Sequence, residues 1–234
     1  MTPLQAGVHT RENLSVLARS EKRALIWIAR RLPRSVNSDH LSSLGLVAMA
    51  AAGLSFTAYP LTKWAAVGVV LSLTANWFGD SLDGTVARVR NQQRPRYGFY
   101  VDHIIDVAGT AMLLTGMAFS GLMNPLIAMA VLIAYLLVSA ESYLATHAAG
   151  IFRMSFLGFG PTELRIVIAA GAIKAAMSPW ASLGTTEPIR LFDVGGIVAS
   201  IGLLLAFAAS SIRNTQALYL AEPLPAGDPE SRAA

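Results

Sequence analysis

The sequence predicts an all-α membrane protein: six transmembrane helices preceded by an N-terminal amphipathic helix at the membrane interface, with both termini cytoplasmic. Of its 234 residues, 54% are hydrophobic and only 14% are charged, whereas a soluble domain carries about 25% charged residues. Six apolar runs also approach or reach the ~20 residues that a helix needs to cross the hydrocarbon core of a bilayer. These two observations define the fold class.

The six runs are separated by segments rich in proline, glycine or charge, which are typical of the turns between transmembrane helices. We expect the spans at residues 41–59, 64–83, 101–121, 125–145, 164–180 and 192–212. An even number of spans places the two ends of the chain on the same side of the membrane.

The distribution of Lys and Arg predicts which side this is. Basic residues precede the first span and follow the second, namely Arg11, Arg19, Lys22, Arg23, Arg30, Arg31, Arg34, Arg88, Arg90, Arg94 and Arg96. Cytoplasmic loops carry such an excess of positive charge, so both termini are predicted to be cytoplasmic. The net charge of +4 then reflects topology and contact with anionic lipid head groups, and no nucleic-acid partner is expected.

The segment before the first span predicts the interfacial helix. Leu25, Ile28 and Leu32 recur at helical spacing between basic flanks, a pattern of helices that lie in the membrane interface. An ordinary cytosolic helix is the alternative, but adjacency to the first span favours the interface. We therefore divide the chain into a cytoplasmic tail with this helix (1–39), a six-helix transmembrane domain (40–213) and a disordered cytoplasmic tail (214–234).

Four aspartates are the sharpest functional signal. Asp80 and Asp83 are three residues apart near the end of the second span, and Asp102 and Asp106 are four apart at the start of the third. On a helix, either spacing places both side chains on one face. The small residues Gly84, Ala87 and Gly98 follow or precede these pairs by about one turn, which leaves room for another molecule to approach the helices.

Carboxylates near a membrane core must be neutralised, because a charged side chain there costs at least a few kcal/mol. Arg88 is the nearest cation in the sequence and cannot balance four aspartates. Divalent metal is the better partner, since Mg²⁺ takes oxygen ligands from carboxylates and substrate phosphates together, and two ions would suit phosphoryl transfer. Proton-sharing aspartates with a structural role, or a relay in a cation- or proton-coupled transporter, remain the alternatives on charge alone.

These residues also resemble a known signature. They form the pattern Asp80-x2-Asp83-Gly84-x2-Ala87-Arg88-x9-Gly98-x3-Asp102-x3-Asp106. This pattern is similar to that of the CDP-alcohol phosphotransferase (CDP-alcohol phosphatidyltransferase) family of integral membrane enzymes, with all eight fixed positions filled. The resemblance implies a transferase of phospholipid biosynthesis that moves a substituted phosphate from a CDP-linked donor to an alcohol and releases CMP. The transporter is then much less favoured.

The resemblance also assigns roles to residues. It implies that Asp80, Asp83, Asp102 and Asp106 bind two Mg²⁺ or Mn²⁺ ions and that Asp106 is the general base. It further implies a nucleotide site at Asp80, Gly84, Ala87, Arg88 and Gly98. A compact chain of six spans resembles the bacterial members that use CDP-diacylglycerol, which implies a homodimer in the bacterial inner membrane with its active site facing the cytoplasm. A donor that carries an amino alcohol, or another soluble CDP-alcohol, is the alternative.

A second polar cluster lies at the predicted cytoplasmic ends of the fourth and fifth spans. We interpret it as the acceptor site, with candidates Glu141, Tyr143, His147, Arg153, Glu163 and Arg165. A phosphorylated alcohol would favour the two arginines, whereas an amino alcohol would favour the carboxylates and the aromatic ring. The sequence offers both sets. Glu163 has a structural alternative, because a helix that begins at Pro161 favours an acidic residue in its first turn.

Overall fold

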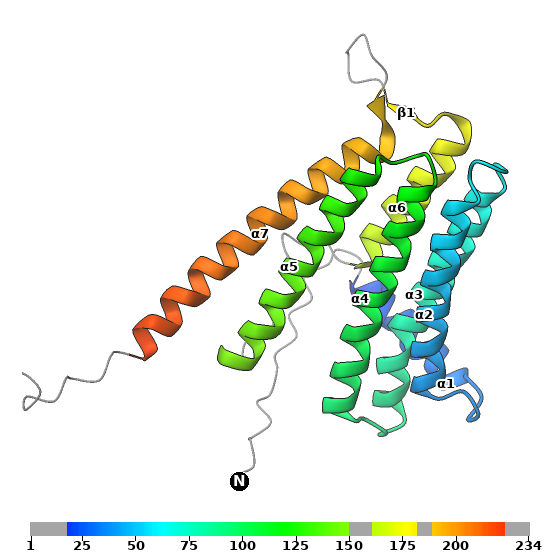
Figure 1. Ribbon diagram of the computed structural model, residues 1–234. Coiled ribbons are helices and arrows are strands. Elements are labelled where there is room, and N and C mark those ends of the chain that lie inside the picture. The colour runs from blue at the N-terminus through cyan, green and yellow to red at the C-terminus, as the bar shows by residue number, and fades with distance from the viewer. Residues whose placement is uncertain (1–17, 150–160, 182–188, 223–234) are drawn as a thin grey trace, which may run out of the picture.

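The computed structural model describes residues 18–149, 161–181 and 189–222, and these fold almost entirely into helices (Figure 1). The helices are α1 (Ala18–Arg31), α2 (Ser38–Thr57), α3 (Ala65–Val89), α4 (Pro95–Phe119), α5 (Pro125–Ala149), α6 (Pro161–Met177) and α7 (Leu191–Ala221). Two short strands, β1 (Trp180–Ala181) and β2 (Ile189–Arg190), pair antiparallel between α6 and α7. The predicted all-α class is thereby confirmed.

Four helices in the described part of the chain are long and apolar enough to cross a membrane: α2, α4, α5 and α7. Each of the six predicted spans overlaps one helix from α2 to α7. However, α6 has only 17 residues, and polar residues such as Asn76 and Asp80 reduce the apolar character of α3. The membrane class is therefore supported by four helices, while six spans and the orientation of the termini stay predictions.

Helix α2 is the centre of the bundle, because both α3 and α4 pack closely against it. A Cβ atom added at Gly116 of α4 would clash with the carbonyl oxygen of Gly53 in α2. A Cβ atom added at Gly79 of α3 would lie 2.7 Å from the backbone nitrogen of Gly45. Small residues of this kind let transmembrane helices approach backbone to backbone. They fix α3 and α4 on two sides of one helix.

Helix α1 packs on the bundle at the ends of α2 and α3 that lie near the aspartates. Its Leu25 and Ala29 are buried in a cluster with Leu41 of α2 and with Leu82 and Val86 of α3. In the same region, the guanidinium of Arg90 donates hydrogen bonds to the carbonyls of Val36, Leu32 and Pro33 at 2.5, 2.9 and 3.0 Å. These bonds satisfy carbonyls just after α1, and so they fasten α1 to the end of α3.

Helices α5 and α7 form a second pair, and they run parallel and side by side in Figure 1. The Asp193 carboxylate at the start of α7 accepts a hydrogen bond of 2.6 Å from the backbone N–H of Asn124, just before α5. Helix α7 continues to Ala221, so residues 214–221 are helical where the sequence predicts the start of a disordered tail. The predicted tails at 1–17 and 223–234 lie outside the described residues.

The close approach of α2 and α4 predicts a destabilising effect of Gly116→Ala. The added methyl group has no room beside Gly53, and overpacking of this kind typically costs about 1–3 kcal/mol. Thermal unfolding in detergent measures the loss. The matched control is Gly202→Ala on α7, where a Cβ meets nothing within 4 Å and helix propensity favours alanine. Equal unfolding temperatures for the two variants would contradict the packing described for α2 and α4.

Candidate active site

The four aspartates lie at the facing ends of α3 and α4. Helix α3 ends at Val89 and α4 starts with Pro95 at its first turn, and Asn91 takes a positive φ of 56° in the turn between them. This left-handed conformation is one that asparagine tolerates well. The reversal brings the last turns of α3 next to the first turns of α4, and with them the two aspartate pairs.

The carboxylates are close enough to act on one another. The charge of Asp106 is repelled by those of Asp80, Asp102 and Asp83, and Asp83 is repelled by Asp80 and Asp102. Four like charges in a mostly buried region are unfavourable unless each finds a compensating partner. Asp80, Asp83 and Asp102 each lie beside a protein group that can compensate or accept part of this charge.

Asp80 is paired with an arginine from α6. The Nη2 atom of Arg165 lies 2.5 Å from Oδ2 of Asp80, and the side chains of the two residues are only 14% and 25% exposed, respectively. The Nε atom of Arg165 donates a second hydrogen bond of 2.7 Å to Oδ1 of Asn76. The Asn76 amide in turn donates to the carbonyl of Gly45 in α2 at 2.9 Å. Asp80 therefore belongs to a polar chain that joins α6, α3 and α2.

Asp83 is held by neutral donors. The hydroxyl of Ser42 in α2 donates to Oδ2 of Asp83 at 2.6 Å, and the backbone N–H of Gly84 donates to Oδ1.

Asp102 of α4 lies beside a histidine. Nδ1 of His103 is 3.9 Å from Oδ2 of Asp102 and 2.6 Å from the carbonyl of Phe99. The His103 ring packs against Phe99 and Tyr143 at centroid distances of 4.1 and 5.1 Å.

The predicted nucleotide residues line the outer end of the same region. A Cβ atom at Gly98 would meet nothing within 4 Å, and one at Gly84 would lie 3.3 Å from the guanidinium of Arg88. Arg88 itself is exposed, and it donates a hydrogen bond of 3.1 Å to the hydroxyl of Thr85. Ala87 is half-buried. Gly98 thus borders open space, and Gly84 lies beneath an exposed cation.

The aspartates suit a metal ion by their chemistry more than by their present spacing. Within residues 18–149, 161–181 and 189–222, no three His, Asp or Glu side chains lie close enough together to hold one ion. Asp80 is turned toward Arg165, and Asp83 toward Ser42 and its own helix. All four groups are nonetheless hard oxygen donors of the kind that Mg²⁺ and Mn²⁺ prefer, and they come from two neighbouring helix ends. Their donor set fits a divalent cation, and side-chain rotations would have to bring them together.

The predicted acceptor cluster is divided among several contacts. Arg165 lies at Asp80, whereas the carboxylate of Glu141 accepts a hydrogen bond of 2.6 Å from Asn214 of α7. The Tyr143 hydroxyl donates to the carbonyl of His103 at 3.5 Å. His147 is exposed near the end of α5, and Glu163 is half-buried in the first turn of α6. Arg153 lies outside the described residues.

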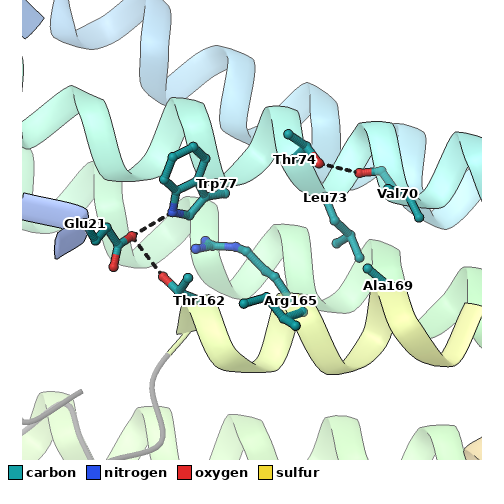
Figure 2. Close-up of a pocket in the computed structure, with 9 residues that line it drawn as sticks. Glu21, Val70, Leu73, Thr74, Trp77, Thr162, Arg165 and Ala169 are labelled. Atoms are coloured by element: carbon teal, nitrogen blue, oxygen red, sulfur yellow. Dashed lines mark hydrogen bonds between the residues drawn. The ribbon is translucent and has the colours of Figure 1, made fainter. Parts of the chain in front are cut away.

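Beside Arg165 there is a cavity of about 360 Å³ between α3 and α6. Its walls are mainly apolar, and Figure 2 shows Arg165 reaching along it from α6 toward Trp77 of α3. The lining residues are Glu21, Val70, Leu73, Thr74, Trp77, Thr162, Arg165, Ile166 and Ala169. The cavity adjoins the polar chain at Asp80 because Arg165 belongs to both.

Sequence reasoning did not single out Ser42, Asn76, Glu21 or Asn214. Asn76 carries a local signal, since it precedes Asp80 by one turn within an apolar helix and so shares its face. The other three find their partners through packing of helices that are distant in sequence. Nothing in their local sequence identifies those partners.

The four long apolar helices indicate an integral membrane protein. The family match is specific: residues 39–209 match the CDP-alcohol phosphatidyltransferase family. The chain belongs to this family, and it is therefore an enzyme that transfers a phosphate-containing group from a CDP-alcohol, in phospholipid biosynthesis. No curated protein matches the chain in sequence.

The ion pair between Arg165 and Asp80 predicts coupled effects on stability. Removing one partner of a mostly buried pair leaves the other charge uncompensated, so Arg165→Met and Asp80→Asn should each lower the unfolding temperature. The double variant should recover part of the loss, with a coupling free energy of about 1–3 kcal/mol once partial exposure is allowed for. Thermal unfolding in detergent with a chelator present measures this cycle. Strictly additive losses would show that the two side chains do not interact.

Proposed function

We propose that this protein transfers a phosphatidyl group from CDP-diacylglycerol to an alcohol hydroxyl and releases CMP. The observation that carries the proposal is the gathering of all four motif aspartates at the adjoining ends of α3 and α4, with Arg165 beside them. Membership of the family supplies the reaction class. The compact arrangement of helices α2 to α7 is what favours the diacylglycerol-linked donor.

In this mechanism Asp106 acts as the general base. Its carboxylate takes the proton of the acceptor hydroxyl while the hydroxyl oxygen attacks the phosphorus of the phosphatidyl group. The bond from that phosphorus to the oxygen of the cytidylate breaks, and CMP leaves with the electron pair. A positioned base of this kind contributes typically about 10²–10⁴-fold to a rate.

Asp80, Asp83 and Asp102, with Asp106, would hold the divalent cations. Two such ions, when bound, neutralise the pyrophosphate and stabilise the charge on the attacking and leaving oxygens. The chain's own part is to fix the carboxylates on rigid helices. Ser42 orients Asp83, and Asn76 orients the arginine that pairs with Asp80. Most of phosphoryl-transfer catalysis consists of this kind of positioning and charge compensation.

The nucleotide would lie along α3 and α4 at Asp80, Gly84, Ala87, Arg88 and Gly98. The open space at Gly98 supports this placement, because a side chain there would narrow the approach to α4. The side chain of Arg88 is exposed and contacts Thr85 of its own helix. Arginine forms bidentate hydrogen bonds with phosphate oxygens, which supports its role at the nucleotide phosphates.

Arg165 favours an acceptor that carries a phosphate. It contacts Asp80 of the motif, and it projects into the adjoining cavity. Of the three residues that would suit an amino alcohol, Glu141, Tyr143 and Glu163, the first two are engaged with α7 and α4. A CDP-linked amino alcohol, or another soluble CDP-alcohol, is therefore the second choice of donor. The distribution of basic residues supports an active site on the cytoplasmic face, and the family resemblance supports a homodimer in a bacterial inner membrane.

The first test of the proposal is CMP release from CDP-diacylglycerol by the purified protein. With Mg²⁺ or Mn²⁺, we expect turnover with a phosphorylated alcohol such as glycerol phosphate or inositol phosphate, and much less with the unphosphorylated alcohols. A chelator should abolish release, and added metal should restore it, because the carboxylates alone leave the pyrophosphate uncompensated. Turnover of soluble CDP-alcohols with diacylglycerol instead would reverse the choice of donor. Absence of CMP from every CDP-linked donor would overturn the proposal.

The role of Asp106 predicts that Asp106→Asn abolishes turnover and largely preserves nucleotide binding. The amide keeps the size of the side chain but cannot accept the hydroxyl proton, so we expect a loss of about 10²–10⁴-fold in kcat. Steady-state kinetics and equilibrium CDP binding measure the two effects. Asp193→Asn, at the distant start of α7, is the matched control and should stay active. Near-normal turnover of Asp106→Asn would show that another group takes the proton.

A further inference from the structure

We propose that Glu21 of the N-terminal helix is a positioning residue that holds Arg165 in place for the acceptor. This inference rests on the proposed function, in which Arg165 binds the phosphate of the acceptor. Glu21 lies in the first turn of α1, outside the residues matched by the family. It belongs to none of the motifs in the sequence.

The Glu21 carboxylate joins three helices through a single oxygen atom. Its Oε1 accepts hydrogen bonds from the Trp77 indole at 2.6 Å and from the Thr162 hydroxyl at 3.0 Å, both drawn in Figure 2. The Ser81 hydroxyl is a third donor at 3.4 Å. All three donors are neutral, and hydrogen bonds to an ionised acceptor are stronger than those between neutral groups. The carboxylate thus ties α1 to both α3 and α6.

These donors are neighbours of the residues that Arg165 binds. Trp77 directly follows Asn76, and Ser81 directly follows Asp80. On the other side, Thr162 precedes Arg165 by three residues, or about one helical turn. The Glu21 contacts therefore fix α3 and α6 beside the ion pair of Arg165 with Asp80. The relative position of the two helices at this point decides whether the guanidinium reaches the motif.

The start of α6 needs such an anchor. Helix α6 begins at Pro161, so Thr162 lies in the first turn, where backbone groups lack helical partners and ends open most easily. Helix α1 provides a fixed support, because Leu25, one turn after Glu21, is buried with Ala29 against α3. Glu21 and Arg165 also line the same cavity. Loss of the Glu21 carboxylate should loosen Arg165 and, through the ion pair, Asp80, while the contacts of Asp83 with Ser42 and Gly84 do not involve Glu21 or Arg165.

The kinetic test compares Glu21→Ala with Glu21→Gln in the full-length protein. We expect Glu21→Ala to raise the KM for the phosphorylated acceptor by about three- to tenfold, the effect of losing hydrogen bonds to a charged group. The KM for CDP-diacylglycerol should rise less than the KM for the acceptor, because Asp80 is the one donor-site residue that contacts Arg165 in the proposed mechanism. Glu21→Gln should recover most of the loss, because its amide oxygen can accept from the same donors. Lys22→Gln, the exposed neighbour on α1, is the control and should behave as the wild type.

Two kinetic results would overturn the inference. One is an unchanged acceptor KM in Glu21→Ala, and the other is an equal rise of the donor and acceptor KM values, which a general loss of structure would produce. The position of α6 gives a second readout that requires no turnover. The sequence contains no cysteine. Spin labels attached to Lys22→Cys on α1 and Leu164→Cys on α6 will therefore react at these two positions and at no other.

We expect a narrow distance distribution between these labels, which Glu21→Ala broadens and Glu21→Gln preserves. An unchanged distribution in Glu21→Ala would contradict the anchoring role, whatever the activity. This measurement also separates the two proposals. If the protein releases no CMP from any donor, the proposed function fails, while the label distances still decide whether Glu21 holds α6.

Discussion

The close contact of α3 and α4 with α2 is the constraint on which the rest of the structure depends. Helices in lipid gain little from hydrophobic burial against one another, so they associate through tight packing and polar contacts. Gly79 and Gly116 provide that packing, since neither position has room for a Cβ atom beside α2. This packing on α2, together with the short turn between α3 and α4, holds the two aspartate pairs in their relative positions. Side-chain rotations can adjust the carboxylates only within that frame.

The second constraint is the energetic cost of acidic groups in a largely apolar bundle. Residues from several helices offset this cost. Ser42 of α2 donates a hydrogen bond to Asp83, Arg165 of α6 pairs with Asp80, and Asn76 of α3 accepts a hydrogen bond from Arg165. Of these three residues, Arg165 brings a positive charge, and Ser42 and Asn76 bring neutral hydrogen-bond donors. In the proposed mechanism, divalent cations would balance the carboxylates and the substrate pyrophosphate together. This is the physical reason for a divalent cation in the proposed mechanism.

The sequence predicts those features that depend on local spacing. The aspartate pairs share helix faces because they are three and four residues apart, and each predicted span overlaps a helix. The pairing of Arg165 with Asp80 could not be predicted, because the two residues are 85 positions apart and meet only when α6 packs on α3. The same holds for Asn214 with Glu141. Helix α7 extends past its apolar run since "NTQALYLA" contains neither proline nor glycine to end it.

Helix α1 shows how a single amphipathic pattern can serve two environments. The apolar stripe that suggested membrane contact is partly used within the protein, because Leu25 and Ala29 are buried against Leu82 and Val86. Trp27 is 58% exposed, and the guanidinium of Arg31 lies 3.9 Å from the centre of its ring. Aromatic and basic side chains together suit the level of lipid head groups. With α1 at that level, the contacts of Glu21 with Trp77 and Thr162 connect the interfacial helix to α3 and α6. The position of Arg165 is then fixed relative to the membrane surface, from which a lipid-linked donor would reach the site.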